Sequence, residues 1–498
     1  MRYFILLFSS IFFSALQADA QKISYSDVLN NETISMDFSI IGKQGNNYLI
    51  YKNYRKKNYI SVYGPSMQMI KNYPLDKIPD KIYGYDFISY ADGVIMFYQY
   101  RKGRTVYSAA LKIDNEGKPI TDPYILDETK ISNAVDSKVY SVAVSENKNL
   151  LLLYKILKKG NTVSLSTFTY NPALELTKNT LDILNYQERQ NIFSDIAVNN
   201  SGDFIIAKLT RKPNRESAYA MEIFSRRTSD TAGISVNIPL NEKLVDEVFI
   251  KSDNINQRFL LNTMFADDKS NNFQGVFSVL YPFNEKDSIL SAFNSFPDSL
   301  RNSFTSSGNA KKAFQNTYLQ NIIIKNDGGF IISAEDQTTT VSNNYYRRRD
   351  NLYNDYYYNY PYYNYGRYTP YNNFYRSTQF NYDNVLICSV DRNLDPEWNR
   401  ILLKRQQELE SANLLSYLIM NTGGMLHFIY AENEKSSQII NNIAISSDGD
   451  INRFPNFKNT NEAYKFVPNS GKQVAYNKII LPCIYKSYLI FALVEFAQ

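Results

Sequence analysis

Few residues in this chain have the types and spacing that catalysis requires. The sequence contains one histidine, His427, which lies in an apolar run where a packing role is expected. No Ser/His/Asp triad can be built without a further histidine, and the two cysteines alone do not make a metal cluster. A glycine-rich phosphate loop is also missing. We therefore expect no enzymatic activity, no catalytic residue, no bound metal and no other cofactor.

Carboxylates are the remaining side chains that could hydrolyse a substrate. Two acids about 5 to 9 Å apart suffice for glycosidase chemistry, so a polysaccharide hydrolase or lyase with its site in the central channel of the fold is the alternative function. The sequence does not identify such a pair, because Asp92, Asp203 and Asp327 lie at turn positions. Asp448 and Asp450 also indicate a hairpin turn, since their run lacks the glycine placement and terminal Glu of a calcium loop.

Lysine, arginine and tyrosine form the most conspicuous clusters. Short basic runs recur along the first half of the chain, and residues 343 to 384 consist almost entirely of Tyr, Asn, Arg and Asp. Clustered cations attract anionic partners, and tyrosine offers a flat apolar ring with a hydroxyl, which binding surfaces favour. The candidate binding residues are Arg55, Lys56, Lys57, Arg101, Lys102, Arg104, Lys158, Lys159, Arg211, Lys212 and Arg215, followed in the Tyr-rich segment by Tyr345, Tyr346, Arg347, Arg348, Arg349, Tyr356, Tyr357, Tyr358, Tyr362 and Tyr363.

Other interpretations of both clusters stay open. The cations could serve solely to keep the hairpin tips soluble, which is the ordinary role of charged residues on a protein surface. The Tyr-rich segment has almost no aliphatic residues and cannot build its own core, so it is either a low-complexity loop without a specific partner or packs against something else. In the second case, the Tyr-rich segment packs against a binding partner or against the rest of this chain.

A repeated phrase indicates how these residues are positioned. A polar turn with Gly or Asn precedes an apolar run, most clearly at 199 to 208, and the phrase returns roughly every 50 residues, a period typical of propeller blades. In the unit around this copy, strands are expected at 192 to 198, 203 to 209, 217 to 225 and 232 to 238. The second strand is apolar on both alternations, which indicates a sheet packed on both faces.

The predicted fold is all-β: one β-propeller of about eight four-stranded blades over residues 21 to 498, with seven blades as the alternative. Residues 22 to 29 are expected to complete the last blade and join the two ends of the chain. Turns such as 113 to 118 carry the Asp, Asn and Gly that tight hairpins need. This sequence of turns and apolar strands resembles secreted bacterial β-propeller repeat proteins, a resemblance that implies the fold and not a function.

Two insertions interrupt the repeat, residues 297 to 316 after the fifth unit and the Tyr-rich segment 343 to 384 between the second and third strands of the sixth. In a propeller the loops between second and third strands leave on the same face as the connections between blades, because antiparallel strands alternate in direction. The basic runs occupy loops of the first kind. The cations and both insertions are therefore predicted to share one face.

The N-terminal residues predict export. Residues 1 to 20 combine Arg2, an apolar run and an Ala18-Asp19-Ala20 cleavage site, which is typical of a secretory signal peptide. No later stretch reaches the length that spans a bilayer. The two cysteines, Cys388 and Cys483, lie in apolar runs and favour buried free thiols over a disulfide. The expected location is the periplasm, the outer membrane periphery or the cell surface.

Charge and compartment together narrow the expected partners. The balance of 54 Lys and Arg against 49 Asp and Glu leaves only +5, too weak a bias for nucleic acid. We expect a non-enzymatic binding or scaffold propeller of the bacterial cell envelope that recognises a protein or an anionic glycan through its cationic, Tyr-rich face. An envelope protein or protein complex is the first expected partner, and an accessory place in an outer-membrane complex is one such role.

Overall fold

The computed structural model describes most of residues 21 to 498. The residues that it does not describe are 1 to 20, 31, 132 to 137, 214, 268 to 271, 285 to 287, 305 to 312, 342 to 377, 410, 435 to 436, 460 to 462 and 497 to 498. The signal-peptide prediction, and the predicted binding residues between Tyr345 and Tyr363, therefore lie outside the described residues.

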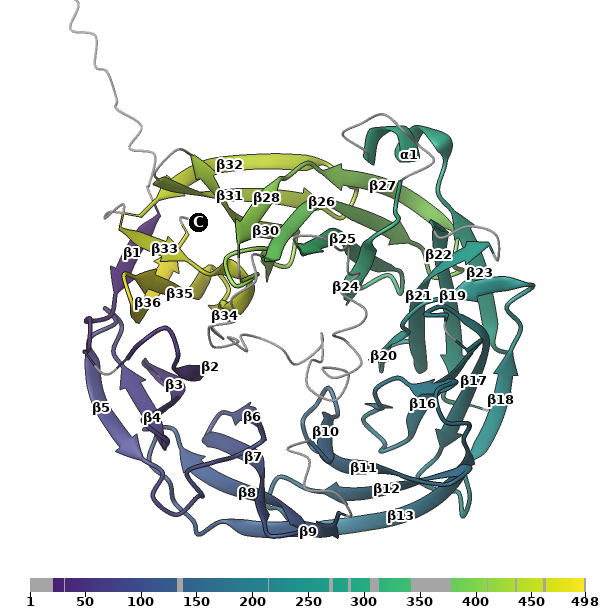
Figure 1. Cartoon of the computed structure of the whole chain (residues 1–498), viewed down its shortest axis with the longest axis horizontal. Coiled ribbons are helices and arrows are strands. Elements are labelled where there is room, and N and C mark those ends of the chain that lie inside the picture. The colour runs from purple at the N-terminus through teal and green to yellow at the C-terminus, as the bar shows by residue number, and fades with distance from the viewer. Residues whose placement is uncertain are drawn as a thin grey trace, which may run out of the picture.

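Antiparallel four-stranded sheets follow one another along the chain and stand around a common centre (Figure 1). In each blade the first strand is innermost and the fourth outermost. The first three blades consist of β2 (Asp37–Gln44), β3 (Asn47–Tyr54), β4 (Lys57–Tyr63) and β5 (Met69–Pro74); β6 (Gly84–Tyr90), β7 (Gly93–Lys102), β8 (Thr105–Asp114) and β9 (Tyr124–Lys130); and β10 (Tyr140–Val144), β11 (Leu151–Lys159), β12 (Thr162–Tyr170) and β13 (Leu176–Asn185).

Blades 4 and 5 share one hydrogen-bonded sheet. Their strands are a split first strand β14 (Asn191–Phe193) and β15 (Ala197–Val198), β16 (Phe204–Arg211), β17 (Ala218–Arg226) and β18 (Ile234–Ile238), then β20 (Phe249–Asp253), β21 (Arg258–Asp267), β22 (Phe273–Pro282) and β23 (Leu290–Ser295). The short β19 (Lys243–Val245) in the connection between them pairs with both β17 and β21. The strands of blade 4 confirm those predicted around residues 192 to 238.

The last three blades carry the additions to the basic pattern. Blade 6 has β24 (Thr317–Ile324), β25 (Phe330–Val341), β26 (Thr378–Val390), β27 (Pro396–Leu402) and an extra strand β28 (Gln406–Leu409); blade 7 has β29 (Tyr417–Asn421), β30 (Met425–Glu434), β31 (Ser437–Ser446) and β32 (Ile451–Lys458); blade 8 has β33 (Tyr464–Phe466), a 3-10 turn (Pro468–Ser470), β34 (Lys472–Ala475), β35 (Lys478–Tyr485), β36 (Tyr488–Glu495) and β1 (Lys22–Tyr25).

The ring is closed by strands from both ends of the chain. β1 pairs antiparallel with β36, with Ile23 opposite Val494, and Ser26 donates its backbone N–H to the carbonyl of Phe491 at 2.8 Å. The seven sheets, one of which contains blades 4 and 5, make eight blades. The predictions of a propeller, of eight blades and of closure by the N-terminal strand are therefore confirmed.

The core lies between the blades, as the unbroken apolar runs predicted. Leu49 and Ile60 of blade 1 pack with Met96 and Ala109 of blade 2, and all four side chains are fully buried. Each middle strand thus contributes both of its faces to apolar clusters, one with each neighbouring blade. The outermost strands are mostly exposed, as in β32, where Phe457 is the one buried residue.

The predicted turns between third and fourth strands are hairpins that dock on the neighbouring blade. In the turn after β8, Asp114 Oδ1 accepts hydrogen bonds from the backbone N–H groups of Glu116 and Lys118 at 3.0 and 2.8 Å. Gly117 has φ 87°, and a Cβ there would come within 2.7 Å of Val62 in blade 1. Glycine is therefore needed both for the turn and for the contact.

The described residues of the first insertion differ from a simple loop. Residues 298 to 304 form helix α1 (Asp298–Phe304), whose Phe304 packs against Phe314 with ring centroids 4.3 Å apart. Both aromatic rings join the core between blades 5 and 6. Of the second insertion, the structure describes residues 378 to 384, which belong to β26. Within the described chain, no helix has the length and apolar character to cross a membrane.

The histidine and the two cysteines, whose side chains could support catalysis or metal binding, are buried in the blades. His427 is buried on β30, its Nδ1 lies 2.9 Å from Asn442 Oδ1, and burial lowers the pKa of its imidazole. Cys388 and Cys483 are buried free thiols in different blades, as predicted. The described residues contain no group of three His, Cys, Asp or Glu side chains placed to hold a metal ion.

Candidate binding face

The predicted basic runs lie at hairpin turns on one face of the ring. We call it the hairpin face, and it comprises the turns between second and third strands together with the connections between blades. The turns that carry the cations lie at residues 54 to 57, 102 to 105, 159 to 162 and 211 to 218, in blades 1 to 4. The exposed cations there are Arg55, Lys56, Lys57, Lys102, Arg104, Lys158, Lys159, Lys212 and Arg215.

Two predicted residues are less accessible than the others. Arg101 is partly exposed, and its guanidinium lies 5.8 Å from the centre of the Tyr83 ring. Arg211 is buried within the blade 4 hairpin, with 8% of its surface exposed, so we do not count it among the exposed cations. It lies at the end of β16, where the register with β17 shifts between Thr210 and Arg211.

Blade 8 adds a cation that the sequence analysis missed. Lys486 lies exposed at the turn between β35 and β36, which is the blade's second-to-third strand turn. Its ammonium lies 5.3 Å from the centre of the Tyr485 ring, and Tyr485 pairs across the hairpin with Tyr488. The run Tyr-Lys-Ser-Tyr was the signal, because it is a shorter form of the basic run of blade 1. The cations thus cover five adjacent blades, 8 and 1 to 4.

Tyrosine pairs lie directly below these hairpin tips. Tyr54 and Tyr59 stack with ring centroids 4.6 Å apart and an interplanar angle of 13°, and Tyr100 and Tyr107 stack at 5.2 Å and 16°. The Lys158 ammonium lies 5.1 Å from the centre of the Tyr186 ring in blade 3. Cations held beside aromatic rings combine a charge with an apolar surface at the same place.

Most of these tips are not neutralised by acids. Among the residues that the structure describes, no salt bridge involves Arg55, Lys56, Lys57, Lys102, Arg104, Lys159 or Lys486. Blade 5 differs, because Lys243 lies 2.5 Å from Asp267 where β21 reaches this face. Among the described residues of this face, the exposed cations without an acidic partner are therefore concentrated on blades 8 and 1 to 4.

A pocket opens on this face where blades 8 and 1 meet. It has a volume of about 310 Å³, and we call it the closure pocket. One wall is the connection from β1 to β2, and the other is the hairpin between β3 and β4. Its lining residues are Asn30, Thr33, Ser35, Met36, Asn53, Tyr54, Arg55 and Lys56.

The hairpin of the closure pocket is strained. Tyr54 pairs with Lys57, so the turn has two central residues, Arg55 and Lys56, with φ of 52° and 60°. Such a turn needs two left-handed residues and normally takes Asn-Gly. The corresponding turns of blades 2 and 3 place Gly103 and Gly160 at φ of 59° and 58°. Blade 1 therefore holds two cations in left-handed conformations, where blades 2 and 3 each have one glycine and blade 8 has Lys486 at φ 54°.

A buried ion pair fixes the opposite wall of the closure pocket. Lys52, on β3, donates to Glu32 Oε1 and to the Tyr63 hydroxyl, both at 2.5 Å. Lys52 and Glu32 are 0% and 1% exposed. Burial lowers the pKa of the Lys52 ammonium, and the Glu32 carboxylate opposes that shift. Because Glu32 lies between Asn30 and Thr33, this pair holds the connecting segment against blade 1.

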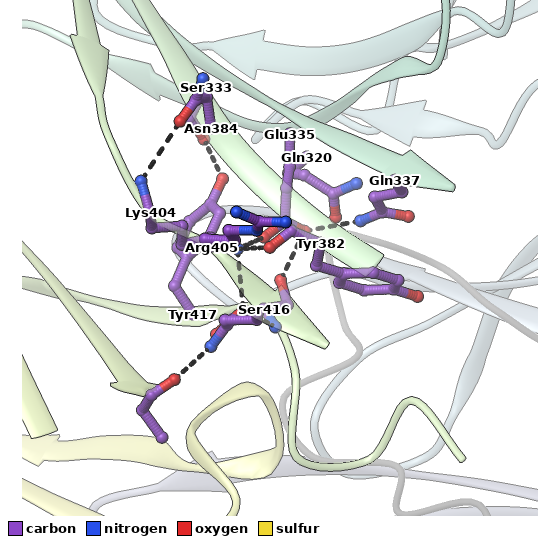
Figure 2. Close-up of polar contacts among 12 residues, drawn as sticks. Gln320, Ser333, Glu335, Gln337, Tyr382, Asn384, Lys404, Arg405, Ser416 and Tyr417 are labelled. Atoms are coloured by element: carbon purple, nitrogen blue, oxygen red, sulfur yellow. Dashed lines mark hydrogen bonds and ion pairs between the residues drawn. The ribbon is translucent and has the colours of Figure 1, made fainter. Parts of the chain in front are cut away.

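A second buried ion pair lies at the base of the hairpin that leads to the Tyr-rich segment (Figure 2). Glu335 Oε1 on β25 lies 2.7 Å from Lys404 Nζ, and neither side chain is exposed. Glu335 Oε2 accepts hydrogen bonds from Gln337 at 2.6 Å and from Ser416 of the next blade at 2.8 Å. The ion pair therefore joins two segments of blade 6, and the hydrogen bond from Ser416 ties the long β25–β26 hairpin to blade 7.

Next to this network a smaller pocket lies between blades 6 and 7. Its volume is about 230 Å³, and Arg405, Gln406, Glu408, Glu432 and Asn433 line it together with other residues. Gln406 is held by three residues: it donates to the carbonyl of Ala431 at 2.6 Å, and it accepts from the Ser416 N–H at 2.8 Å and from Lys404 Nζ at 2.7 Å. Charges of both signs line this pocket, unlike the closure pocket.

Carboxyl groups gather below the β25–β26 hairpin. Burial raises the pKa of Asp336 to about 7, and the carboxylates of Asp383 and Glu335 contribute, while Lys404 opposes them. Burial also raises the pKa of Asp383, against the effect of Lys404. Like charges around one cation cannot all ionise without cost, so this cluster holds a proton near neutral pH.

A further set of acids lies on or next to the innermost strands: Asp86 is on β6, Asp195 lies between β14 and β15, and Glu247 precedes β20. Burial raises the pKa of Asp195 well above its ordinary value, and Glu247 and Asp86 contribute, whereas Tyr154 and Lys138 oppose the shift. Tyr154 donates its hydroxyl to Asp195 at 2.9 Å, and Lys138 Nζ lies 3.9 Å from Asp86. Asp92, Asp203 and Asp327, weighed as acids from the sequence, lie in turns; Asp203, for example, accepts from Asn199 and from the Thr228 N–H.

Comparisons with known proteins give the fold and no family. No family model matches this sequence, and no curated protein matches it either. One solved structure that resembles it comes from work on two prolyl endopeptidases, with 9% sequence identity, coverage of 92% of this chain and 55% of that chain, and a TM-score of 0.43. A second is the β-propeller domain of the Trilobed protease from Pyrococcus furiosus, with 7% identity, coverage of 84% and 96%, and a TM-score of 0.37. A third is an endo-arabinase from Bacteroides thetaiotaomicron, with 15% identity, coverage of 53% and 99%, and a TM-score of 0.28. The chain spans about half the length of the endopeptidases it matches.

These comparisons contradict the expectation that this chain is not an enzyme, because the similar structures include peptidases and an arabinase. That expectation rested on the scarcity of histidine and cysteine, and propellers host catalysis as well as binding. The likeness is one of fold alone and gives this chain no reaction. A carboxylate-dependent polysaccharide hydrolase or lyase with its site in the propeller channel stays the alternative prediction.

Proposed function

We propose that this protein binds an anionic partner of the bacterial cell envelope through its hairpin face. The observation that carries the proposal is the row of exposed cations on five adjacent blades, most of them without an acidic partner among the described residues. A chain with a net charge of only +5 gains a strongly positive region by this arrangement. Such a region concentrates anions near it and speeds their encounter.

The partner is an acidic protein surface or an anionic glycan, and the exported location follows the signal peptide predicted from residues 1 to 20. Tyrosine pairs below the cations support both choices, because rings stack on sugar faces and pack against proteins equally well. Lys486 at blade 8 and Lys57 at blade 1 join the row across the closure of the ring. The binding surface therefore does not depend on the Tyr-rich segment alone.

Binding of a linear acidic polysaccharide tests the proposal. We expect polygalacturonate to bind the mature protein and its neutral methyl ester to bind much more weakly, as measured by calorimetry. Lys102→Gln with Lys159→Gln should weaken binding about tenfold, because it removes two cations from adjacent blades. The matched control is Lys43→Gln with Lys118→Gln, which removes two exposed cations from turns on the opposite face.

Equal binding of the charged and neutral polymers would overturn the proposal, as would equal loss in both double variants. The same incubations report newly formed reducing ends, so a hydrolase or lyase activity toward the polymer would be detected directly.

A further inference from the structure

We propose that the closure pocket binds one carboxylated sugar residue of an acidic polysaccharide. This inference rests on the proposed function of the hairpin face and names the place and the chemical class of its ligand. Three features of the pocket support it: the chemistry of its lining, the conformation of its hairpin and the way its walls are fixed.

The lining of the closure pocket is suited to an anion that also carries hydroxyl groups. It contains two cations, Arg55 and Lys56, and no carboxylate. Arginine pairs with a carboxylate through two parallel hydrogen bonds, which gives direction as well as charge. The amide of Asn30 can both donate and accept hydrogen bonds, as sugar hydroxyls require. The amide nitrogen of Asn53 already donates to Asn58 Oδ1 and to the carbonyl of Asp80, so Asn53 offers its side-chain oxygen as an acceptor. A bare phosphate would use the cations but has no ring to contact the apolar lining.

The size of the pocket favours a small sugar unit over a protein surface. A volume of about 310 Å³ lies at the lower end of the range found for small-molecule sites. Tyr54 and Met36 supply apolar lining beside the polar groups, and sugar rings have apolar faces of their own. A concave site of this size admits one residue of a chain whose neighbours lie on the surrounding cationic hairpins.

The strained turn indicates that the two cations are retained for binding. Arg55 and Lys56 both adopt left-handed φ angles in a two-residue turn, where Asn-Gly would fit without strain. Backbone strain of this kind collects at ligand sites, where it positions a group for its partner. Replacement by Asn-Gly should therefore relieve strain and remove binding together, an outcome that general unfolding cannot imitate.

The walls of the pocket are fixed before a ligand arrives. The Glu32–Lys52 ion pair anchors the connecting segment on blade 1. The N–H of Ile34 donates to the carbonyl of Ser487 at 3.0 Å, and the N–H of Leu489 donates to the carbonyl of Glu32 at 2.9 Å, which anchor the same segment on blade 8. A site that is already ordered loses little conformational entropy on binding.

The experiment compares digalacturonate, digalactose and inorganic phosphate as ligands of the mature protein by calorimetry. We expect digalacturonate to bind, digalactose to bind about tenfold more weakly or not at all, and phosphate to compete poorly. The variant Arg55→Asn with Lys56→Gly should bind digalacturonate about tenfold more weakly and should melt at the wild-type temperature or above it. Lys43→Gln with Lys118→Gln, on the opposite face, should bind it as the wild type does.

Each contrary result has a definite meaning. Wild-type affinity of the Arg55→Asn, Lys56→Gly variant for digalacturonate would overturn the pocket assignment, and if polygalacturonate binding still depended on Lys102 and Lys159, the proposed function would stand. Phosphate binding as tight as digalacturonate binding would overturn the sugar assignment. Failure of the wild type to bind either the polymer or the disaccharide would overturn both proposals.

Discussion

At the scale of single residues, two buried ion pairs each join separate segments of the chain. Glu32–Lys52 fastens the segment after β1 to blade 1. Glu335–Lys404 joins two segments of blade 6, and Glu335 also accepts a hydrogen bond from Ser416 of blade 7. Buried ion pairs add little net stability compared with apolar residues, but breaking one leaves a charge without compensation. Their role here is to hold segments in place, because each pair lies next to a pocket of the hairpin face.

The Glu335–Lys404 pair allows a direct test of this view. Lys404→Met should lower the free energy of unfolding by about 3 to 5 kcal/mol, because Glu335 would stay buried as an unpaired carboxylate. The double variant Glu335→Gln, Lys404→Met should recover a large part of the loss. Urea unfolding measures both. The control Lys77→Met breaks an exposed pair with Asp122 and should cost less than about 1 kcal/mol. Equal losses at the two sites would contradict the account.

The carboxyl cluster below the same hairpin predicts a pH effect. The pKa of Asp336 is raised to about 7 in the folded protein, above its value in the unfolded chain, so the fold favours the protonated form. Its contribution to stability is fully present at low pH and is lost as the pH rises toward 7 and beyond. Asp336→Asn should therefore stabilise the protein at pH 8 by about 1 to 2 kcal/mol more than at pH 5.

Thermal unfolding of wild type and variant at the two pH values measures this difference. Asp76→Asn, at an exposed position, serves as the control and should shift stability equally at both. A gain for Asp336→Asn that is the same at pH 5 and pH 8 would contradict the raised pKa.

Residue-level chemistry was only partly predictable from the sequence. The exposed basic tips could be found because their runs recur with the blades, whereas Arg211 belongs to such a run and is buried. The closure pocket could not be found, because it joins residues 30 to 36 to residues 53 to 56 across the seam of the ring. The Glu335–Lys404 pair joins two blade 6 segments separated by the Tyr-rich insertion. The adjacent acids Glu335 and Asp336 in an apolar strand were the one visible signal.

At the scale of elements, most of the architecture could be predicted, because strands and turns depend on local sequence. Apolar runs on both alternations marked the middle strands, and Asx or Gly residues marked the hairpins. Helix α1 was not predicted, because its seven residues form a single short element within an insertion. The strands β19 and β28 were also missed, since each is too short to show a period and forms by pairing with a blade.

Closure by β1 is the element-level feature on which the ring most depends. Ile23 packs into the apolar cluster of blades 7 and 8, whereas the side chain of the preceding Lys22 is exposed. Ile23→Asp should destabilise the protein by about 1 to 3 kcal/mol, because it places a charge against this apolar cluster at a half-buried position and weakens the pairing that covers the edge of β36. Lys22→Asp, one position earlier, should have little effect. Thermal unfolding and light scattering test both variants, and equal behaviour would argue against closure by β1.

At the scale of the whole molecule, the ring gathers exposed cations of a nearly neutral chain into a positive sector on the described part of one face. The hairpin face carries exposed cations on blades 8 and 1 to 4, and paired or mixed charges on blades 5 and 7. The net charge of +5 gives no hint of this, because it averages over every face. Propeller topology creates the sector by bringing equivalent loops of successive blades together.

The salt dependence of polymer binding tests this account most directly. Between about 50 and 300 mM salt, the affinity of the mature protein for polygalacturonate should fall by roughly tenfold or more, because exposed charges are screened over these conditions. The Lys102→Gln, Lys159→Gln variant should show a visibly shallower dependence, and the Lys43→Gln, Lys118→Gln variant should match the wild type. An affinity that does not change with salt, or the same dependence in all three proteins, would contradict a binding role for the hairpin face.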